Sequence, residues 1–226
     1  MRFDTGGIYH IYNRGNNKQT IFFTDKNYLF FLEKVKKFIL PNCDMLAWCL
    51  MPNHFHFLIR ANEISCQLIP GRPVDTSRLV ESVRLTLSGY TKAINIQEKL
   101  IGNLFQQKTK SKLVGDSENN YSLTAFHYIH QNPVKAGLAD RLEDWQYSSY
   151  SDYAGLRDGK LCDKDLAVDL LQLNLSTFSS DSYAVLSDEM LDKIFLQGPG
   201  VRRFPLTSDA LSNRQNLRCL TFEENV

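Results

Sequence analysis

Short apolar segments alternate along the first two thirds of the chain with longer segments whose apolar residues repeat at helical spacing. The short segments, rich in β-branched and aromatic residues, predict strands at residues 6–14, 44–50, 54–60 and 104–114. Only Met51, Pro52 and Asn53 separate the two middle strands, which is typical of a hairpin. The helical spacing predicts a helix of about 14 residues that Asp25 caps, a second helix opened by residues 75–77, and a third helix at residues 122–131.

The order of these elements, β-α-β-β-α-β with a trailing helix, is that of a ferredoxin-like split βαβ domain of the α+β class. We expect this domain to span residues 1–154. Beyond it the composition shifts, and two short amphipathic helices are expected at residues 163–173 and 186–196, joined by a serine-rich stretch. The last residues predict one more weak helix or a tail. Residues 155–226 are therefore interpreted as a helical C-terminal extension.

Composition narrows the class of protein. The 226 residues, 43% of them hydrophobic, suffice to bury a core. No apolar run approaches the roughly 20 residues of a membrane span, and the N-terminus lacks the apolar segment of a signal peptide. The five cysteines are scattered, without CxxC spacing, which argues against a disulfide framework and a zinc ribbon. We expect a cytoplasmic protein without a membrane partner.

Charge is unevenly distributed although the formal net charge is only +1. Residues 1–154 carry 18 Lys and Arg against 14 Asp and Glu, while residues 155–226 carry 8 against 11. The weakly basic first part is compatible with a nucleic-acid partner but falls short of a strongly basic surface. The acidity of the extension makes a direct contact with nucleic acid the least favoured of its roles, the others being closure of the site and added stability.

The predicted strand at residues 54–60 carries the first chemical signal. The two-residue period of a strand places His54 and His56 on one face and Phe55, Phe57 and Ile59 on the other. The two imidazoles are then about 7 Å apart at the backbone, close enough to bind one cation. Two such histidines alone are more often packed or exposed side chains than ligands, so the interpretation depends on a third partner.

The third predicted helix supplies that partner. Tyr128 and Asn132 are four residues apart and share one helical face. Pro133 favours an extended backbone at Asn132, so we expect the helix to fray or kink there and the amide oxygen to turn toward a cation. The phenol of Tyr128 would then lie beside the same ion.

This combination suits one reaction. A tyrosine oxygen attacks a DNA phosphodiester, becomes attached to the 5′ phosphate and releases a 3′ hydroxyl, and the bond exchange needs no ATP. A divalent ion on His54, His56 and Asn132 would polarise the scissile phosphate. The oxygen-rich substrate favours Mg²⁺ or Mn²⁺, and imidazole ligands favour Mn²⁺ in vitro.

Ordered motifs support the same hypothesis. The sequence Tyr-His-Ile-Tyr-Asn-Arg-Gly of residues 9–15, the His-Phe-His of residues 54–56, and Tyr-Ile-His-Gln-Asn-Pro-Val-Lys-Ala-Gly-Leu of residues 128–138 follow one another. Over residues 3–153 the chain resembles the HUH single-strand transposases of the IS200-like superfamily, and among them the REP-associated tyrosine transposases. The resemblance implies a ferredoxin-like fold, His54 and His56 as metal ligands, Tyr128 as nucleophile and Asn132 as the third metal-side residue. It also implies hairpins of single-stranded DNA as partner, REP-like or from insertion-sequence ends, and a monomer or a homodimer.

Further residues are weighed as DNA contacts. Asn13 and Arg14 could be only a strand end and turn, or Arg14 could donate to a DNA phosphate. A predicted strand carries the alternating lysines Lys108, Lys110 and Lys112. Lysines at such a position commonly prevent aggregation through a sheet edge, and they would also suit a single DNA strand that runs along this edge. His10, His127 and His130 receive no assigned role, with help in proton transfer left open for His127 or His130.

Rival interpretations stay open. Tyr121, Tyr147, Tyr150 and Tyr153 compete as nucleophiles, but none has an amide residue four positions later. A domesticated hairpin-binding protein without significant cleavage would have no use for Tyr128 beside a metal. A metal-dependent phosphohydrolase would favour a third histidine near the pair, where the sequence has Leu58.

Overall fold

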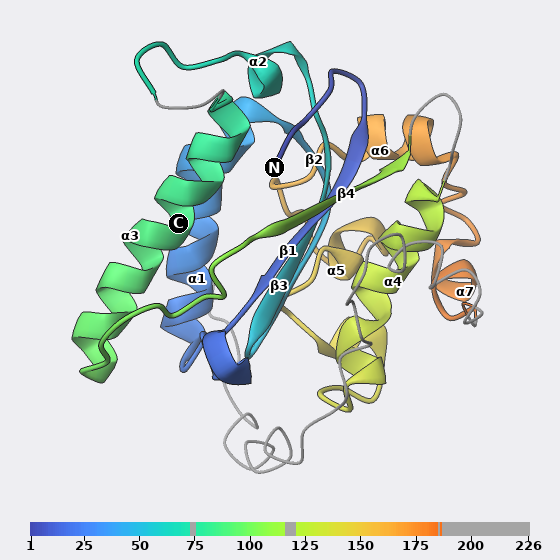
Figure 1. The fold of residues 1–226 in the computed structure, drawn as a ribbon. Coiled ribbons are helices and arrows are strands. Elements are labelled where there is room, and N and C mark those ends of the chain that lie inside the picture. The colour runs from blue at the N-terminus through green and yellow to red at the C-terminus, as the bar shows by residue number, and fades with distance from the viewer. Residues whose placement is uncertain (73–75, 116–120, 185, 187–226) are drawn as a thin grey trace.

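Four strands form one antiparallel sheet at the centre of the molecule (Figure 1). The computed structural model describes residues 1–72, 76–115, 121–184 and 186. The strands lie in the order β2-β3-β1-β4 and are β1 (Ile8–Arg14), β2 (Asp44–Met51), β3 (His54–Arg60) and β4 (Lys110–Gly115). This order, with the second and third strands joined as a hairpin, confirms the predicted ferredoxin-like arrangement.

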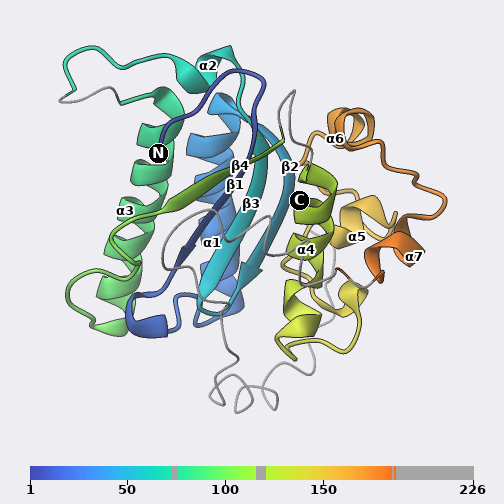
Figure 2. The same ribbon diagram turned by 45° about the vertical axis from the view of Figure 1, so that its right-hand side comes forward.

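Helices cover both faces of this sheet, so β1, β2 and β3 are buried on both sides, whereas the edge strand β4 is partly exposed (Figures 1 and 2). On one face lie α1 (Asp25–Lys34) and α3 (Arg78–Glu98). On the other face lie α4 (Ser122–Lys135), α5 (Tyr150–Tyr153), α6 (Lys164–Leu171) and α7 (Phe178–Ser182). A single short turn of helix, α2 (Glu63–Cys66), follows β3. The three layers leave α4 directly over the strands that carry the histidines.

The helix starts follow the capping residues of the sequence, with one correction. Asp25 was expected to cap α1, but it is the first helical residue and Thr24 is the cap. Asn27 completes the start, because its Oδ1 accepts from the backbone N–H groups of Phe23 and Thr24 at 3.1 Å each. At the start of α3, Oγ of Ser77 accepts from the N–H of Val80 as expected for an N-cap.

The predicted strand at residues 104–114 is wrong in its first half. The strand β4 begins only at Lys110. Leu104 and Phe105 are buried instead in the loop before it, where Phe105 forms an isolated bridge with Gly15 and its ring lies 6.0 Å from that of Phe55. The apolar residues that suggested a longer strand therefore belong to the core rather than to the sheet.

The prediction of a fray at Asn132 is also wrong. The helix α4 continues through Pro133 to Lys135. Proline removes one N–H from the helical ladder, but the turn beyond it is closed by bonds from Ala136 to the Asn132 carbonyl and from Leu138 to the Pro133 carbonyl, both 2.9 Å. Gly137, with φ of 66°, supplies the left-handed residue that ends the helix.

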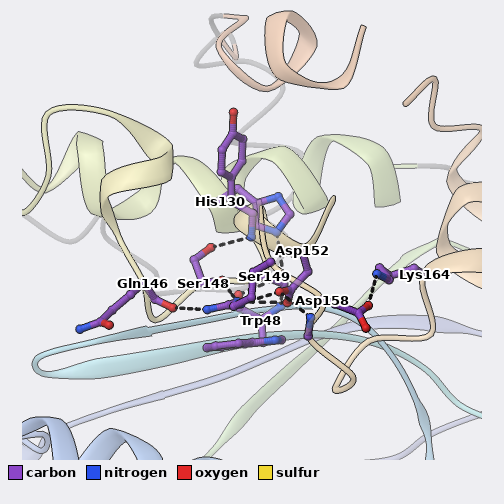
Figure 3. A network of polar contacts seen from close by, with 11 residues as sticks. Trp48, His130, Gln146, Ser148, Ser149, Asp152, Asp158 and Lys164 are labelled. Atoms are coloured by element: carbon purple, nitrogen blue, oxygen red, sulfur yellow. Dashed lines mark hydrogen bonds and ion pairs between the residues drawn. The ribbon is translucent and has the colours of Figure 1, made fainter. Parts of the chain in front are cut away.

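The outer edge of β2 is covered by the chain that follows α4. Leu50 donates its N–H to the Tyr147 carbonyl at 2.8 Å, and Ser149 donates its N–H to the Trp48 carbonyl at 2.9 Å. Figure 3 shows the side chains gathered there, including a bond of 2.8 Å between Oγ of Ser149 and Nε2 of His130 on α4. The segment thus protects a sheet edge and fixes α4 to β2.

The described part of the C-terminal segment packs into the same core. Its buried hydrophobic residues are Cys162, Ala167, Leu171 and Phe178, and the expected helix at 163–173 is present as α6, capped by Asp163. The helix expected at 186–196 and the last residues lie outside the described residues, apart from Leu186. The domain boundary at residue 154 stays a prediction. None of the helices in the described part of the chain has the length and apolarity of a membrane span.

Candidate metal and tyrosine site

The site lies on the face of the sheet that α4 covers. In the β1–β3 pairing, Tyr12 is opposite His56 and Arg14 is opposite His54, so these side chains share a face, as residues paired across strands do. The same register places His10 opposite Leu58. The strand period predicted that His54 and His56 share a face, and the structure brings their rings to 4.9 Å between centroids.

Asn53 fixes the proton of His54. Nδ1 of His54 lies 2.5 Å from Oδ1 of Asn53, and the Asn53 amide donates from Nδ2 to the Lys18 carbonyl at 3.3 Å. Because Oδ1 can only accept, Nδ1 of His54 is the donor, and the lone pair of this imidazole is then on Nε2. This is the tautomer in which Nε2 can serve as a metal ligand.

His56 is held by a second histidine. Its Nδ1 lies 2.8 Å from Nε2 of His10, and the two rings stack with centroids 5.0 Å apart. The Nε2 of His56 is buried, and no atom of the described residues hydrogen-bonds to it. A buried nitrogen without a protein partner is the kind of group that a bound ion satisfies.

Burial keeps these imidazoles neutral. It lowers the pKa of His54 to about 3, with the charge of Arg14 acting in the same direction. It also lowers the pKa of His10 to about 3, with a contribution from Lys112, and holds the pKa of His56 well below its ordinary value. The neutral imidazole is the form that binds metals, so the pair is in its ligating state at neutral pH.

Tyr128 on α4 faces this cluster. Its ring centroid lies 5.9 Å from that of His56 and 6.2 Å from that of His10. Burial raises the pKa of Tyr128, and a hydrogen bond with the Asn132 side chain acts in the opposite direction. The Nζ of Lys135, two turns further along α4, lies 5.7 Å from the centroid of the Tyr128 ring. The phenol is thus placed among neutral imidazoles and a cation.

Asn132 is oriented by the helix that carries it. Its Nδ2 donates to the Tyr128 carbonyl at 2.9 Å, so Oδ1 is the atom of the amide that remains as an acceptor or ligand. The described residues hold no cluster of three or more His, Cys, Asp or Glu suited to a metal. Imidazole nitrogens and an amide oxygen are nevertheless donors of the kind that fit Mn²⁺ or Mg²⁺.

The residues predicted to contact DNA fall into two groups, a buried pair at the end of β1 and three lysines in or just before β4. Asn13 is buried, and its Nδ2 donates to Oγ1 of Thr109 and to the Gln106 carbonyl, so it ties β1 to the chain before β4. Arg14 is only 6% exposed and lies beside His54.

The three lysines lie along the opposite edge of the sheet from β2. Lys108 is exposed and precedes β4, whereas Lys110 and Lys112 pair with Tyr12 and His10 and therefore share the site's face. Lys112 is half-buried, and burial lowers its pKa. The alternation of Lys110 and Lys112 along one face of a strand agrees with the prediction, while Lys108 lies outside the strand.

The rival tyrosines are engaged elsewhere. The hydroxyl of Tyr147 donates to Oδ1 of Asp25, and that of Tyr153 donates to the Leu46 carbonyl, both at 2.5 Å. Tyr150 is buried at 2% exposure, and Tyr121 directly precedes α4. The structure brings Tyr128, and none of these four, into ring contact with His10 and His56.

Sequence reasoning missed His10 and Lys135. The two-residue period of β1 places His10 on the same face as Arg14, but only the pairing of β1 with β3 shows that His10 lies beside His56. Lys135 is seven residues after Tyr128 and hence on the same helical face, a signal that the expected fray at Pro133 concealed. His127 and His130 face away toward other partners, Oγ of Ser182 at 3.2 Å and Oγ of Ser149 at 2.8 Å.

Comparison with known proteins gives a structural match. No protein-family model matches the sequence, and no curated protein matches it. A solved structure of a REP-associated tyrosine transposase bound to a REP hairpin superposes with a TM-score of 0.53 and 19% sequence identity. The match covers 72% of this chain and 92% of the other. At this identity the likeness shows that the two proteins share a fold.

Proposed function

We propose that this protein is a metal-dependent enzyme of the HUH type that nicks and joins single-stranded DNA, with Tyr128 as its nucleophile. The observation that carries the proposal is the contact of the Tyr128 ring with the His10–His56 pair, one helical turn from Asn132. The phenol on α4 lies near the neutral imidazoles of β1 and β3, and the same helix carries the Asn132 amide. The shared fold with a tyrosine transposase supports the same conclusion.

The covalent step exchanges one phosphodiester for another. Oη of Tyr128 attacks the scissile phosphorus and loses its proton, the P–O3′ bond breaks, and the departing 3′ oxygen takes up a proton to become a hydroxyl. The product is a 5′ phosphotyrosine. Attack of a 3′ hydroxyl on this linkage reverses the exchange, re-forms the DNA strand and restores the phenol. No bond energy is lost to water, so the reaction needs no nucleotide cofactor.

Protein groups prepare each part of this exchange. His54, His56 and Asn132 would hold the divalent ion, Mn²⁺ or Mg²⁺, which when bound polarises the phosphate and stabilises its developing charge. Because burial raises the pKa of Tyr128, the phenol keeps its proton in the free protein. The ammonium of Lys135 near its ring favours the phenolate during attack.

The substrate follows from the charge around the site. Arg14, Lys110 and Lys112 share the face of the sheet that carries the histidines, and phosphates are the groups that such cations bind. The solved neighbour is bound to a REP hairpin. We therefore propose hairpins of single-stranded DNA, REP-like or from insertion-sequence ends, as substrates. Lys108 and Lys110 would contact the sugar–phosphate backbone of this DNA.

The test is a cleavage assay with matched tyrosine variants. The protein is incubated with Mn²⁺ and labelled hairpin oligonucleotides from the DNA that adjoins its gene, and the products are separated on denaturing gels. We expect a protein–DNA adduct on the 5′ end of the downstream fragment, lost in Tyr128→Phe and in EDTA and kept in Tyr121→Phe. Tight hairpin binding without any adduct, unchanged in Tyr128→Phe, would instead indicate a hairpin-binding protein without cleavage.

A further inference from the structure

His10 is a buried histidine on β1 that no part of the predicted site required. Its side chain is 0% exposed. It stacks on His56 with centroids 5.0 Å apart and on Tyr12 with centroids 4.8 Å apart, and it shares a hydrogen bond of 2.8 Å with His56. A buried imidazole bonded to a candidate metal ligand can decide the state of that ligand.

The bond between the two rings contains one proton, which can belong to either. If His10 donates from Nε2, then Nδ1 of His56 accepts and the His56 proton is on Nε2. That proton would be buried without an acceptor, since none of the described residues supplies one. If His56 donates from Nδ1, its Nε2 carries a lone pair, and the proton of His10 then lies on its own Nδ1, which is buried as well. Each arrangement therefore places one buried N–H, and a cation on Nε2 of His56 favours the second, because a ligand must offer a lone pair.

We propose that His10 is a positioning residue, which accepts the Nδ1 proton of His56 and so presents the Nε2 lone pair of His56 as a ligand for a divalent cation. The inference rests on the proposed function, because that cation is the one held by His54, His56 and Asn132. Asn53 does the same for His54 through its Oδ1. Both histidines of the pair thus donate from Nδ1 to a protein acceptor, one to an amide and one to an imidazole.

The first test needs only the wild-type chain. Two-dimensional NMR of the full-length, metal-free protein labelled with ¹⁵N-histidine distinguishes the two neutral tautomers, and His56→Gln assigns the His56 signals by their loss. We expect His56 to be protonated on Nδ1 and bare on Nε2. Protonation on Nε2 would overturn the proposal, whatever the protein does with DNA.

The second test measures Mn²⁺ affinity by titration calorimetry. In His10→Gln the Oε1 atom can still accept the His56 proton, whereas His10→Leu has no acceptor. We expect the dissociation constant for Mn²⁺ to rise roughly 10- to 100-fold in His10→Leu and only a few-fold in His10→Gln, as for other outer-shell partners of metal ligands. The control Tyr12→Phe keeps the ring that stacks on His10 and should bind Mn²⁺ as the wild type does.

The outcomes separate the role of His10 from the proposed function. An unchanged constant in His10→Leu, or equal losses in His10→Leu and His10→Gln, would show that His10 only fills space. A wild-type protein that binds no Mn²⁺ would count against the proposed metal site, and the tautomer of His56 would then decide on His10 by itself. The tautomer measurement also decides if His10→Leu does not fold.

Discussion

Ser149→Ala should destabilise the protein where α4 meets the sheet (Figure 3). The hydroxyl of Ser149 is completely buried and has three partners. Its Oγ accepts from the Trp48 N–H at 3.0 Å, lies 3.2 Å from the Trp48 carbonyl, to which it donates, and lies 2.8 Å from Nε2 of His130. With its one proton given to the carbonyl, the hydroxyl accepts from His130, so both lone pairs are used.

The magnitude follows from what the substitution leaves behind. Alanine keeps the backbone bond from the Ser149 N–H to the Trp48 carbonyl but strands the Trp48 N–H and the Nε2 proton of His130. A buried donor without an acceptor costs about 1–3 kcal/mol. With partial relaxation, we expect the free energy of unfolding to fall by about 2–4 kcal/mol. Because His130 is two residues after Tyr128, the loss falls on the helix that carries the proposed nucleophile.

Urea unfolding followed by tryptophan fluorescence checks this number. The control Ser180→Ala removes an exposed hydroxyl that donates to the Thr177 carbonyl, and it should change stability by less than about 0.5 kcal/mol. In a His130→Leu background, Ser149→Ala should cost about 1 kcal/mol less, since one stranded donor is already gone. A Ser149→Ala variant as stable as the Ser180→Ala control would refute the reasoning.

Three further predictions concern metal, pH and salt. His56→Gln should abolish the stabilisation by Mn²⁺, which for the wild type is about 2.7 kcal/mol at a Mn²⁺ concentration of 100 times the dissociation constant. Melting temperatures with and without Mn²⁺ check this, and a shift as large in His56→Gln as in the wild type would contradict the ligand assignment. Burial lowers the pKa of His130 from 6.5 to about 3, so between these values the unfolded chain binds a proton that the folded chain does not. Stability should therefore fall as pH drops from 6.5, and His130→Leu should reduce that slope by about 1.4 kcal/mol per pH unit in urea titrations at several pH values, whereas an unchanged slope would exclude His130 as a contributor. Lys110→Gln, on the exposed edge of the sheet, should weaken hairpin binding alike for all sequences and reduce the slope of log K against log salt concentration by about one unit or less. Fluorescence anisotropy at several salt concentrations measures this slope, and a slope equal to that of the wild type would contradict the prediction.

The sequence sufficed for features that depend on local periodicity. The placement of His54 and His56 on one face requires only the two-residue period of a strand, and the hairpin at Pro52 and Asn53 brings β2 and β3 together without distant contacts. The pairing of Tyr128 with Asn132 likewise requires only the helical repeat. These features were predicted because each is decided within a few residues.

Features that depend on distant contacts were missed. The bond between His10 and His56 joins residues 46 positions apart and follows from the register of β1 against β3, which no local pattern contains. Phe105 looked like a strand residue because core loops and strands use the same apolar side chains. At Pro133 the local preference for a break was overridden by the bonds that close the turn after α4.

The central claim is that Tyr128 forms the covalent link to DNA. Protein incubated with Mn²⁺ and a cleaved hairpin would be digested with nuclease and then protease, and the peptides sequenced by tandem mass spectrometry. The account predicts a nucleotide attached through its 5′ phosphate to the peptide that contains Tyr128, and to that tyrosine within it. Cleavage without any adduct, or an adduct on Tyr121, Tyr147, Tyr150 or Tyr153, would contradict it.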